Sequence, residues 1–385
     1  MEPFEEIPQK YKEICDTLKN TTIKEKYFDA FSEYINNTIK KDGKILLIGS
    51  GRMESICEIA SLFFSAKDLR NIYCSSDSSY PKKIKEKDTV IAVSGSGSTD
   101  RTINKLYPAI DAEANIIGIT ANKNSELSEL VSEKDNLLIL LDGKHKEYDD
   151  TYYERQINGK HNPLNLEGTE IELNTLLFFT NYFGSEETGR TPTEFHKSFC
   201  ETLCSYTPDP TEFIKAYELL PEVTDFEKQI YSLNKTITVG EGLSGKMSDL
   251  FRIRLGHCAK KNQERRVESY KTANSIKEGD TVFIFSVSGE GLPYKYAKKS
   301  KTKDANIISI TSENSPLDKI SDSVIHIPNR EEKKGKGEVY HIQPNPEKCL
   351  PEYIALLNSE CFVYSTVNYE NLEESDLKYH HSDFT

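Results

Sequence analysis

An apolar run that stops abruptly in a loop of small hydroxyl residues is the feature that most constrains this chain. Ile91-Ala92-Val93 leads directly into Ser94-Gly95-Ser96-Gly97-Ser98-Thr99, and Asp100 then stands where a helix would be capped. An apolar strand, a Gly/Ser turn and a helix in this order form half of a parallel α/β unit. Such a loop presents hydroxyls and backbone N–H groups at a helix N-terminus, which is a way to hold a phosphate without basic side chains.

The same order of apolar strand, Gly/Ser-rich turn and helix occurs a second time, about 190 residues later in the chain. There the apolar run Val282–Phe285 is followed by Ser286-Val287-Ser288-Gly289-Glu290-Gly291. The neighbouring segments repeat as well, since Asn115-Ile116-Ile117 is identical to Asn306-Ile307-Ile308. A repeat of this length indicates a duplicated domain rather than the units of a solenoid.

The remaining pattern alternates strands and helices in both halves. In the first half we expect helices over 8–40, 53–66, 100–112 and 169–183, and strands over 44–49, 71–74, 89–93, 115–120 and 136–141. In the second half we expect helices over 211–233, from 292 and over 352–367, and strands over 235–240 and 281–286. Pro192, Pro208 and Pro210 indicate a loop-rich junction, so we place two domains at 1–210 and 211–385.

Composition excludes several classes of function. The formal net charge of -13 argues against a nucleic-acid-binding protein, which usually shows a basic footprint. No apolar run reaches the length of a membrane span, and the acidic N-terminus lacks a signal-peptide pattern. The eight cysteines include no Cys-x-x-Cys pair, which is typical of a reduced, cytoplasmic protein. The histidines do not form a set at metal-ligand spacing, so we expect neither a metal nor a cofactor.

Two of these motifs resemble those of the sugar isomerase (SIS) domain. The strand, Ser94-x-Ser96-Gly97-x-Thr99 and the following helix are similar to its phosphate loop, and Gly49-x-Gly51-Arg52 is similar to its first turn. The resemblance implies two tandem SIS domains, each an α-β-α sandwich around a mainly parallel five-stranded, flavodoxin-like sheet. A homodimer, which would be a pseudo-tetramer of SIS domains, is also implied.

A closer resemblance is to archaeal 6-phospho-3-hexuloisomerases. It rests on Tyr153 with Arg155-Gln156 and Gly159, on Gly168-Thr169 followed by Glu172, and on the histidine-bearing tail that ends in Tyr379-His380-His381. The resemblance implies that Glu172 is the catalytic base and that His381 and Arg52 assist in ring opening and in polarising the sugar oxygens.

Each of these residues also has a simpler interpretation. A glutamate near the start of a helix commonly stabilises the helix dipole, a role for which Glu167 and Glu170 compete with Glu172. Arg52 could form a surface ion pair, and His381 lies close to the C-terminus, where disorder is common. The hydroxyls that we expect to bind phosphate are those of Ser50, Ser94, Ser96, Ser98 and Thr99.

The second half departs from the family pattern. Leu243 stands in place of Arg52, Gly291 in place of Thr99, and Glu352 follows Pro351 rather than a Gly-Thr pair. One complete site could therefore be assembled from both halves, or the ancestral activity could have drifted.

The sequence thus favours a phosphosugar isomerase that interconverts ketose and aldose, or hexulose, 6-phosphates through an enediol. The glucose, mannose or glucosamine 6-phosphate type is the nearest enzyme alternative. A phosphosugar sensor without catalysis is the alternative from another class.

Overall fold

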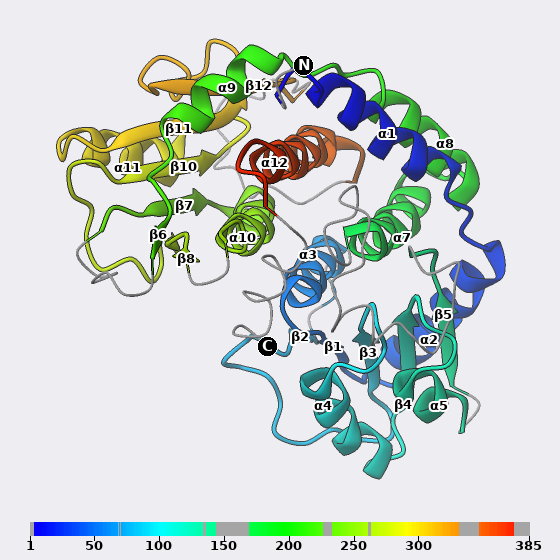
Figure 1. Cartoon of the computed structure of the whole chain (residues 1–385). Coiled ribbons are helices and arrows are strands. Elements are labelled where there is room, and N and C mark those ends of the chain that lie inside the picture. The colour runs from blue at the N-terminus through cyan, green and yellow to red at the C-terminus, as the bar shows by residue number, and fades with distance from the viewer. Residues whose placement is uncertain are drawn as a thin grey trace.

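Two five-stranded parallel sheets, one from each half of the chain, form the framework (Figure 1). The structure is a computed structural model that describes residues 4–67, 69, 71–133, 136–143, 169–225, 233–260, 263–330 and 346–372. The first sheet has the order β2-β1-β3-β4-β5. Its strands are β1 (Ile45–Ile48), β2 (Ile72–Cys74), β3 (Thr89–Val93), β4 (Asn115–Thr120) and β5 (Leu137–Leu140).

The second sheet repeats that order as β9-β7-β10-β11-β12. Its strands are β7 (Thr236–Gly240), β9 (Val267–Ser269), β10 (Thr281–Phe285), β11 (Asn306–Ser312) and β12 (Ser323–Ile327). The order 2-1-3-4-5 is that of a flavodoxin-like sheet. A separate antiparallel pair joins β6 (Thr224–Asp225) to β8 (Gln263–Glu264). The predicted fold of two tandem parallel α/β domains is therefore confirmed.

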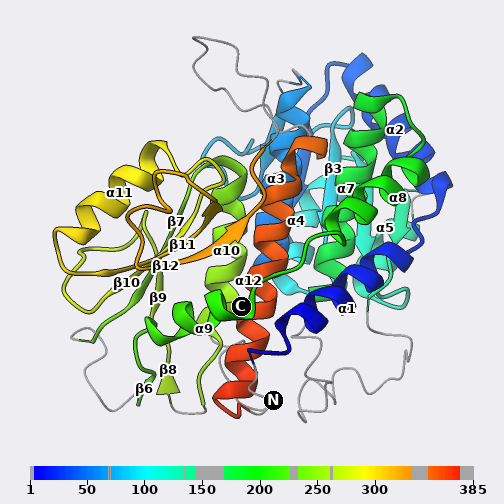
Figure 2. The same ribbon diagram turned by 90° about the horizontal axis from the view of Figure 1, so that it is seen from above.

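Four helices lie between the two sheets, as Figures 1 and 2 show. They are α3 (Arg52–Ala66), α7 (Thr169–Thr188), α10 (Gly242–Gly256) and α12 (Leu350–Tyr369), the last preceded by a 3-10 turn at Pro346–Cys349. The other helices are α1 (Ile7–Asn20), α2 (Glu25–Lys40), α4 (Asp100–Asp111), α5 (Glu126–Ser132), α8 (Pro192–Leu203), α9 (Pro210–Glu218) and α11 (Gly291–Lys301).

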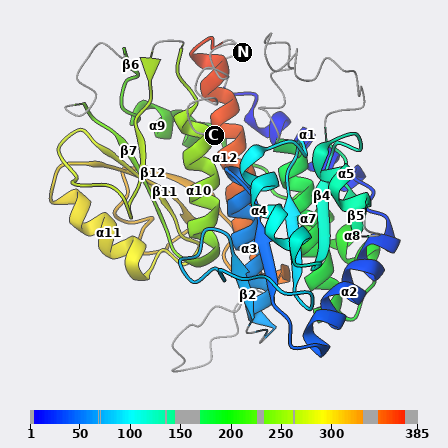
Figure 3. The same cartoon turned by 90° about the horizontal axis from the view of Figure 1, so that it is seen from below.

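Both faces of each sheet are covered. Along β1, Ile45 and Leu47 face the central helices, whereas Leu46 and Ile48 face α4 and α5. The outer face of the second sheet packs against α11, which lies across that sheet from α10 and α12 in Figure 3. Since strands of a parallel sheet are buried on both faces, they are apolar throughout rather than alternating. The inner faces of both sheets and the central helices share one continuous core.

The helix α12 is buried on all sides, because every residue from Pro351 to Val363 is buried. A helix that is apolar around its whole circumference belongs in a protein interior. Phe362 contacts Phe251 of α10 and Phe283 of β10, with ring centroids 6.0 and 5.7 Å apart. Such aromatic pairs contribute about 0.5–1.5 kcal/mol beyond the area that they bury.

A buried aspartate begins the central strand of each sheet. Asp88 accepts hydrogen bonds from the N–H groups of Lys44 and Lys85, both at 2.9 Å. Asp280 makes the same pair of contacts with the N–H groups of Lys235 and Lys277, at 3.0 and 2.9 Å. Both carboxylates therefore tie the start of one strand to the turn before the next, and the repeat found in the sequence is a repeat of detailed structure.

Three expectations about helices were wrong. The helix expected over 8–40 is broken at 21–24 into α1 and α2. The helix expected over 211–233 ends at Glu218, shortly before Pro221, whose ring cannot continue a helix. The junction around Pro192 is the helix α8, in which Pro192 is the first residue and Thr191 forms a capping box with Glu194. Proline is well suited to the first turn of a helix.

None of the described helices is both long and apolar enough to cross a membrane. All eight cysteines are free thiols, and all but Cys204 are buried.

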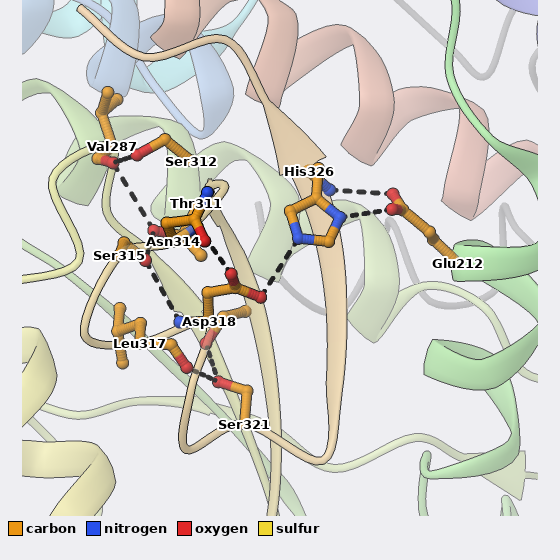
Figure 4. A network of polar contacts seen from close by, with 11 residues as sticks. Glu212, Val287, Thr311, Ser312, Asn314, Ser315, Leu317, Asp318, Ser321 and His326 are labelled. Carbon is orange, nitrogen blue, oxygen red and sulfur yellow. Dashed lines mark hydrogen bonds and ion pairs between the residues drawn. The ribbon is translucent and has the colours of Figure 1, made fainter.

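His326 on the edge strand β12 links three parts of the second half (Figure 4). Its Nδ1 contacts Glu212 on α9, and its backbone N–H donates to the same carboxylate at 2.8 Å. Its Nε2 lies 3.1 Å from Asp318 in the loop after β11. Burial lowers the pKa of His326, but the hydrogen bonds and charges of Glu212 and Asp318 outweigh burial and raise the pKa above its usual value.

A raised pKa predicts how the stability contribution of His326 depends on pH. The protonated side chain stabilises the fold fully below the unfolded-state pKa of about 6.5 and loses this effect as pH rises through the folded-state pKa. We expect the free energy of unfolding of wild type to exceed that of His326→Gln most near pH 6 and the difference to shrink toward pH 9. Urea denaturation of both proteins at each pH measures this difference in the free energy of unfolding.

His196→Gln is the matched control, because burial lowers the pKa of His196. Wild type should lose stability relative to that variant as pH falls below about 6.5. The same pH trend for both variants would contradict the assignment.

Candidate functional site

The first sheet has its topological switch point between β1 and β3. In open parallel sheets, ligands bind in the crevice outside the carboxyl ends of the strands at such a point. The turn at Ser50 follows β1, and the loop Ser94–Thr99 follows β3. Thr102 Oγ1 on α4 donates a hydrogen bond to Ser50 Oγ at 3.2 Å. Two of the sequence-predicted phosphate elements therefore lie together.

The hydroxyls of the loop gather around Thr99, the residue that precedes α4. Thr99 Oγ1 lies 3.1 Å from Ser94 Oγ and 3.5 Å from Ser96 Oγ. The N–H groups of Gly97 and Ser98 donate back to Ser94 Oγ and Ser96 Oγ, at 3.1 and 3.3 Å. The loop is thus an arrangement of hydroxyls and N–H groups at the N-terminus of a 12-residue helix, a combination that suits an anion.

Gly97 fixes the shape of this loop. Its φ is 71°, in the left-handed region that favours glycine. A methyl group at Gly97 would lie 2.0 Å from Ser125 Oγ and 3.0 Å from Thr120 Oγ1. Thr120 in turn donates to the carbonyl oxygen of Gly95 at 3.1 Å. The loop is therefore closed from behind by β4 and the start of α5.

A cluster of four buried charges lies where the halves meet, with one residue from each central helix. Arg52 Nη1 on α3 lies 2.7 Å from Glu172 Oε2 on α7. Arg254 Nη2 on α10 lies 3.2 Å from the same oxygen. Arg52 Nη2 also contacts Glu360 on α12. The four residues are only 3 to 8% exposed, and their formal charges cancel.

The phosphate loop packs against the residues next to this cluster in the chain. A methyl group at Gly95 would lie 2.9 Å from Ile171 Cγ2 and 3.4 Å from Met53 Cε. Ile171 and Met53 are the immediate chain neighbours of Glu172 and Arg52. The loop therefore packs against the N-terminal turns of α3 and α7, which carry the candidate base and the candidate arginine.

The structure thus brings together most of the site residues expected from the sequence. Arg52 is buried rather than a surface residue, and the Glu172 carboxylate is engaged by arginines of both halves. Glu352, the counterpart considered in the second half, is buried in a separate pair with Arg330. His381, Glu167 and the segment from Tyr153 to Gly159 lie outside the described residues.

Sequence reasoning missed Arg254, Glu360 and Lys105. Glu360 had a signal, since it interrupts an otherwise apolar helix, where a charge requires a partner. Arg254 had none, because its contact crosses between the halves. Lys105 on α4 donates to Ser75 Oγ at 3.0 Å and lies 3.6 Å from Glu54, which places a cation beside the first turn of α3.

In the part of the chain that the structure describes, no group of three or more His, Cys, Asp or Glu side chains is arranged to hold a metal ion.

Comparison with known proteins agrees with the fold of both halves. The family model described as SIS domain matches residues 38–148 and 229–343, one segment in each half. An uncharacterized protein of Aeropyrum pernix is 28% identical over 151 residues, which is 39% of this chain and 68% of that protein.

Several solved structures share the fold over almost the whole chain. A tagatose-6-phosphate ketose/aldose isomerase of Escherichia coli matches with a TM-score of 0.59 at 13% identity, over 97% of this chain and 94% of its own. The C-terminal domain of a glucosamine-fructose-6-phosphate aminotransferase of Francisella tularensis matches with a TM-score of 0.55 at 14% identity, over 96% of this chain and 95% of its own. A glucosamine-6-phosphate deaminase of Thermotoga maritima matches with a TM-score of 0.53 at 12% identity, over 97% of this chain and 96% of its own. At these identities the likeness establishes the fold.

The buried cluster predicts a large loss of stability when Glu172 is removed. In Glu172→Ala the guanidinium groups of Arg52 and Arg254 would lose the carboxylate between them, and breaking a buried pair in this way costs roughly 3–5 kcal/mol. Urea denaturation measures the loss. The control Glu186→Ala, an exposed position on the same helix, should stay within about 0.5 kcal/mol of wild type. A loss below about 1 kcal/mol for Glu172→Ala would contradict the pairing.

Gly97→Ala should destabilise the protein by more than the cost of placing alanine in a left-handed backbone conformation. A left-handed conformation costs a non-glycine residue about 1–2 kcal/mol, and the new methyl group would also collide with Ser125. Gly189→Ala is the control, because Gly189 has a φ of 69° but no atom within 4 Å of the added methyl group. Denaturant titration should show the larger destabilisation for Gly97→Ala. Equal losses would show that the contact with Ser125 is unimportant.

Proposed function

Because the chain belongs to the SIS domain family, we propose that it is a phosphosugar isomerase whose site lies in its first half. The observation that carries the proposal is the contact of the Ser94–Thr99 loop with the helix starts that hold Arg52 and Glu172. An anion loop and a carboxylate on a helix turn that packs against this loop are two of the parts that isomerisation of a sugar phosphate requires. The reaction interconverts ketose and aldose, or hexulose, 6-phosphates, with the 6-phospho-3-hexuloisomerase type as the preferred substrate class.

The loop binds the phosphate group through its hydroxyls and N–H groups and thereby positions the carbonyl end of the open-chain sugar. Glu172 takes the proton from the carbon beside the carbonyl, so that the C–H electron pair forms the double bond of the enediol. The same carboxyl group then returns the proton to the neighbouring carbon, and the carbonyl has moved by one position. Hydroxyl and carbonyl oxygens exchange a proton in the opposite sense, so the reaction needs no oxidant.

The arginines determine which carboxylate oxygen acts. Both Arg52 and Arg254 contact Oε2 of Glu172, and we therefore assign the proton transfer to Oε1. Arg254 belongs to the second half, so the site is built from both halves of one chain. In this proposal Arg254 is a positioning residue, because it acts on the sugar only through Glu172.

The names of the structural neighbours agree with a substrate of this class. The isomerase, the aminotransferase and the deaminase described above are all named for a sugar 6-phosphate. The argument from fold is an analogy, because one fold can host different reactions. The choice of an isomerase rests on the position of Glu172 beside the loop.

A phosphosugar sensor is the second candidate, and one observation favours it. The Glu172 carboxylate is paired with two arginines in a buried cluster, which is an arrangement that also suits a purely structural role. A protein of this kind would bind a sugar phosphate at the same loop without turning it over.

Solvent proton exchange separates the two candidates. Wild-type protein is incubated in deuterated water with hexose, hexulose and amino-sugar 6-phosphates, and deuterium incorporation is followed by NMR while binding is followed by thermal shift. We expect Glu172→Gln to keep binding and to lose exchange by roughly 100- to 10,000-fold, the usual contribution of a general base. Glu186→Gln, an exposed change on the same helix, should exchange at the wild-type rate.

Binding without exchange in wild type would establish the sensor. Exchange at the normal rate in Glu172→Gln would remove Glu172 from the mechanism, and the absence of binding by every sugar phosphate would exclude both candidates.

A further inference from the structure

The second half contains a loop with nearly the same backbone as the phosphate loop. Gly289 has a φ of 65°, close to the 71° of Gly97. The Gly289 N–H donates to Ser286 Oγ at 3.2 Å, as the Gly97 N–H does to Ser94 Oγ at 3.1 Å. A methyl group at Gly289 would lie 2.5 Å from Ser315 Oγ, which closes the loop from behind as Ser125 does in the first half.

The turn that follows the first strand is also repeated. Gly51 and Gly242 have φ values of 58° and 54°, and both precede or begin a central helix. The residue before each of them is Ser50 in the first half and Glu241 in the second. The two side chains therefore start from equivalent positions at the switch point of their sheets.

Glu241 uses this position to cap the neighbouring helix. Its Oε2 accepts a hydrogen bond from the Leu292 N–H, in the first turn of α11, at 3.3 Å. The same oxygen would lie 3.3 Å from a methyl group at Gly291. In the first half the corresponding helix end faces the hydroxyls of Thr99 and Ser50. A carboxylate thus lies where the first half offers space for a phosphate.

A second negative charge reinforces this difference. The loops align residue for residue from Ser94 and Ser286, so Glu290 takes the place of Ser98. Of the five hydroxyl positions of the first half, Ser50 and Ser98 are replaced by glutamates and Thr99 by glycine, whereas the other two remain serines. A phosphate dianion would meet like charges here and would have to displace Glu241 from the helix N-terminus.

We propose that Glu241 is an internal anion that fills the second loop, so that each chain binds one sugar phosphate, in its first half. This inference rests on the proposed function for the site and the ligand class, but the block by Glu241 is a separate claim. The second domain then contributes Arg254 to the first site, and its own anion loop has only a structural role.

Equilibrium dialysis of the full chain with radiolabelled inorganic phosphate, and calorimetric titration with fructose 6-phosphate, count the sites. We expect one equivalent per chain for wild type and two for Glu241→Ser/Glu290→Ser, which restores the serines of the first half. Each charge at a helix N-terminus changes anion affinity a few-fold, so affinity of the second loop should rise on the order of 10-fold. The matched control Glu222→Ser/Glu278→Ser removes two exposed charges elsewhere in the same half and should keep one equivalent.

The outcomes separate this inference from the proposed function. Two equivalents for wild type, or one equivalent for both double variants, would overturn the block by Glu241 and leave the first site intact. No binding by wild type together with one equivalent for Glu241→Ser/Glu290→Ser would support the block and overturn the site proposed in the first half. Folding of each variant is checked by its unfolding midpoint, which should fall only slightly, because Glu241 and Glu290 are exposed and serine is itself favoured at helix N-termini.

Discussion

Four buried charges, one from each central helix, hold the two halves of this chain in one arrangement. Arg52, Glu172, Arg254 and Glu360 come from α3, α7, α10 and α12. Charges are costly to remove from water, so each of these side chains depends on the others for its compensation. The helices cannot slide or rotate against one another without leaving a charge unpaired. A largely apolar interface therefore acquires a fixed register.

The same cluster includes Glu172, the residue to which we assign the proposed chemistry. Glu172 lies at the start of α7, beside the loop that closes over the end of β3. The contacts that stabilise the interface also fix the position of the carboxylate on the first turn of α7. Stability and the proposed catalysis thus share residues, and variants at Glu172 must be compared by binding, exchange and unfolding together.

Duplication explains why the halves can differ. In the proposed function one site draws Arg254 from the other half, and the second anion loop is not required to bind a ligand. Its backbone persists, because Gly289, Ser286 and Ser315 still pack as their counterparts do. Its charge differs, because Glu241 and Glu290 stand where the first half has the neutral Ser50 and Ser98. Backbone shape and ligand specificity are therefore set by different residues.

The sequence by itself determined the two parallel α/β halves and the phosphate loop, because strand pattern, Gly-rich turns and internal repeat are local or periodic signals. It misjudged the helix at Pro192 and the lengths of helices near 21 and 221, where capping and proline decide. Only the tertiary structure decided that Arg254 and Glu360 join Arg52 and Glu172, and that Glu241 reaches α11. Such contacts join residues far apart in the chain, and no spacing along the sequence encodes the packing that brings them together.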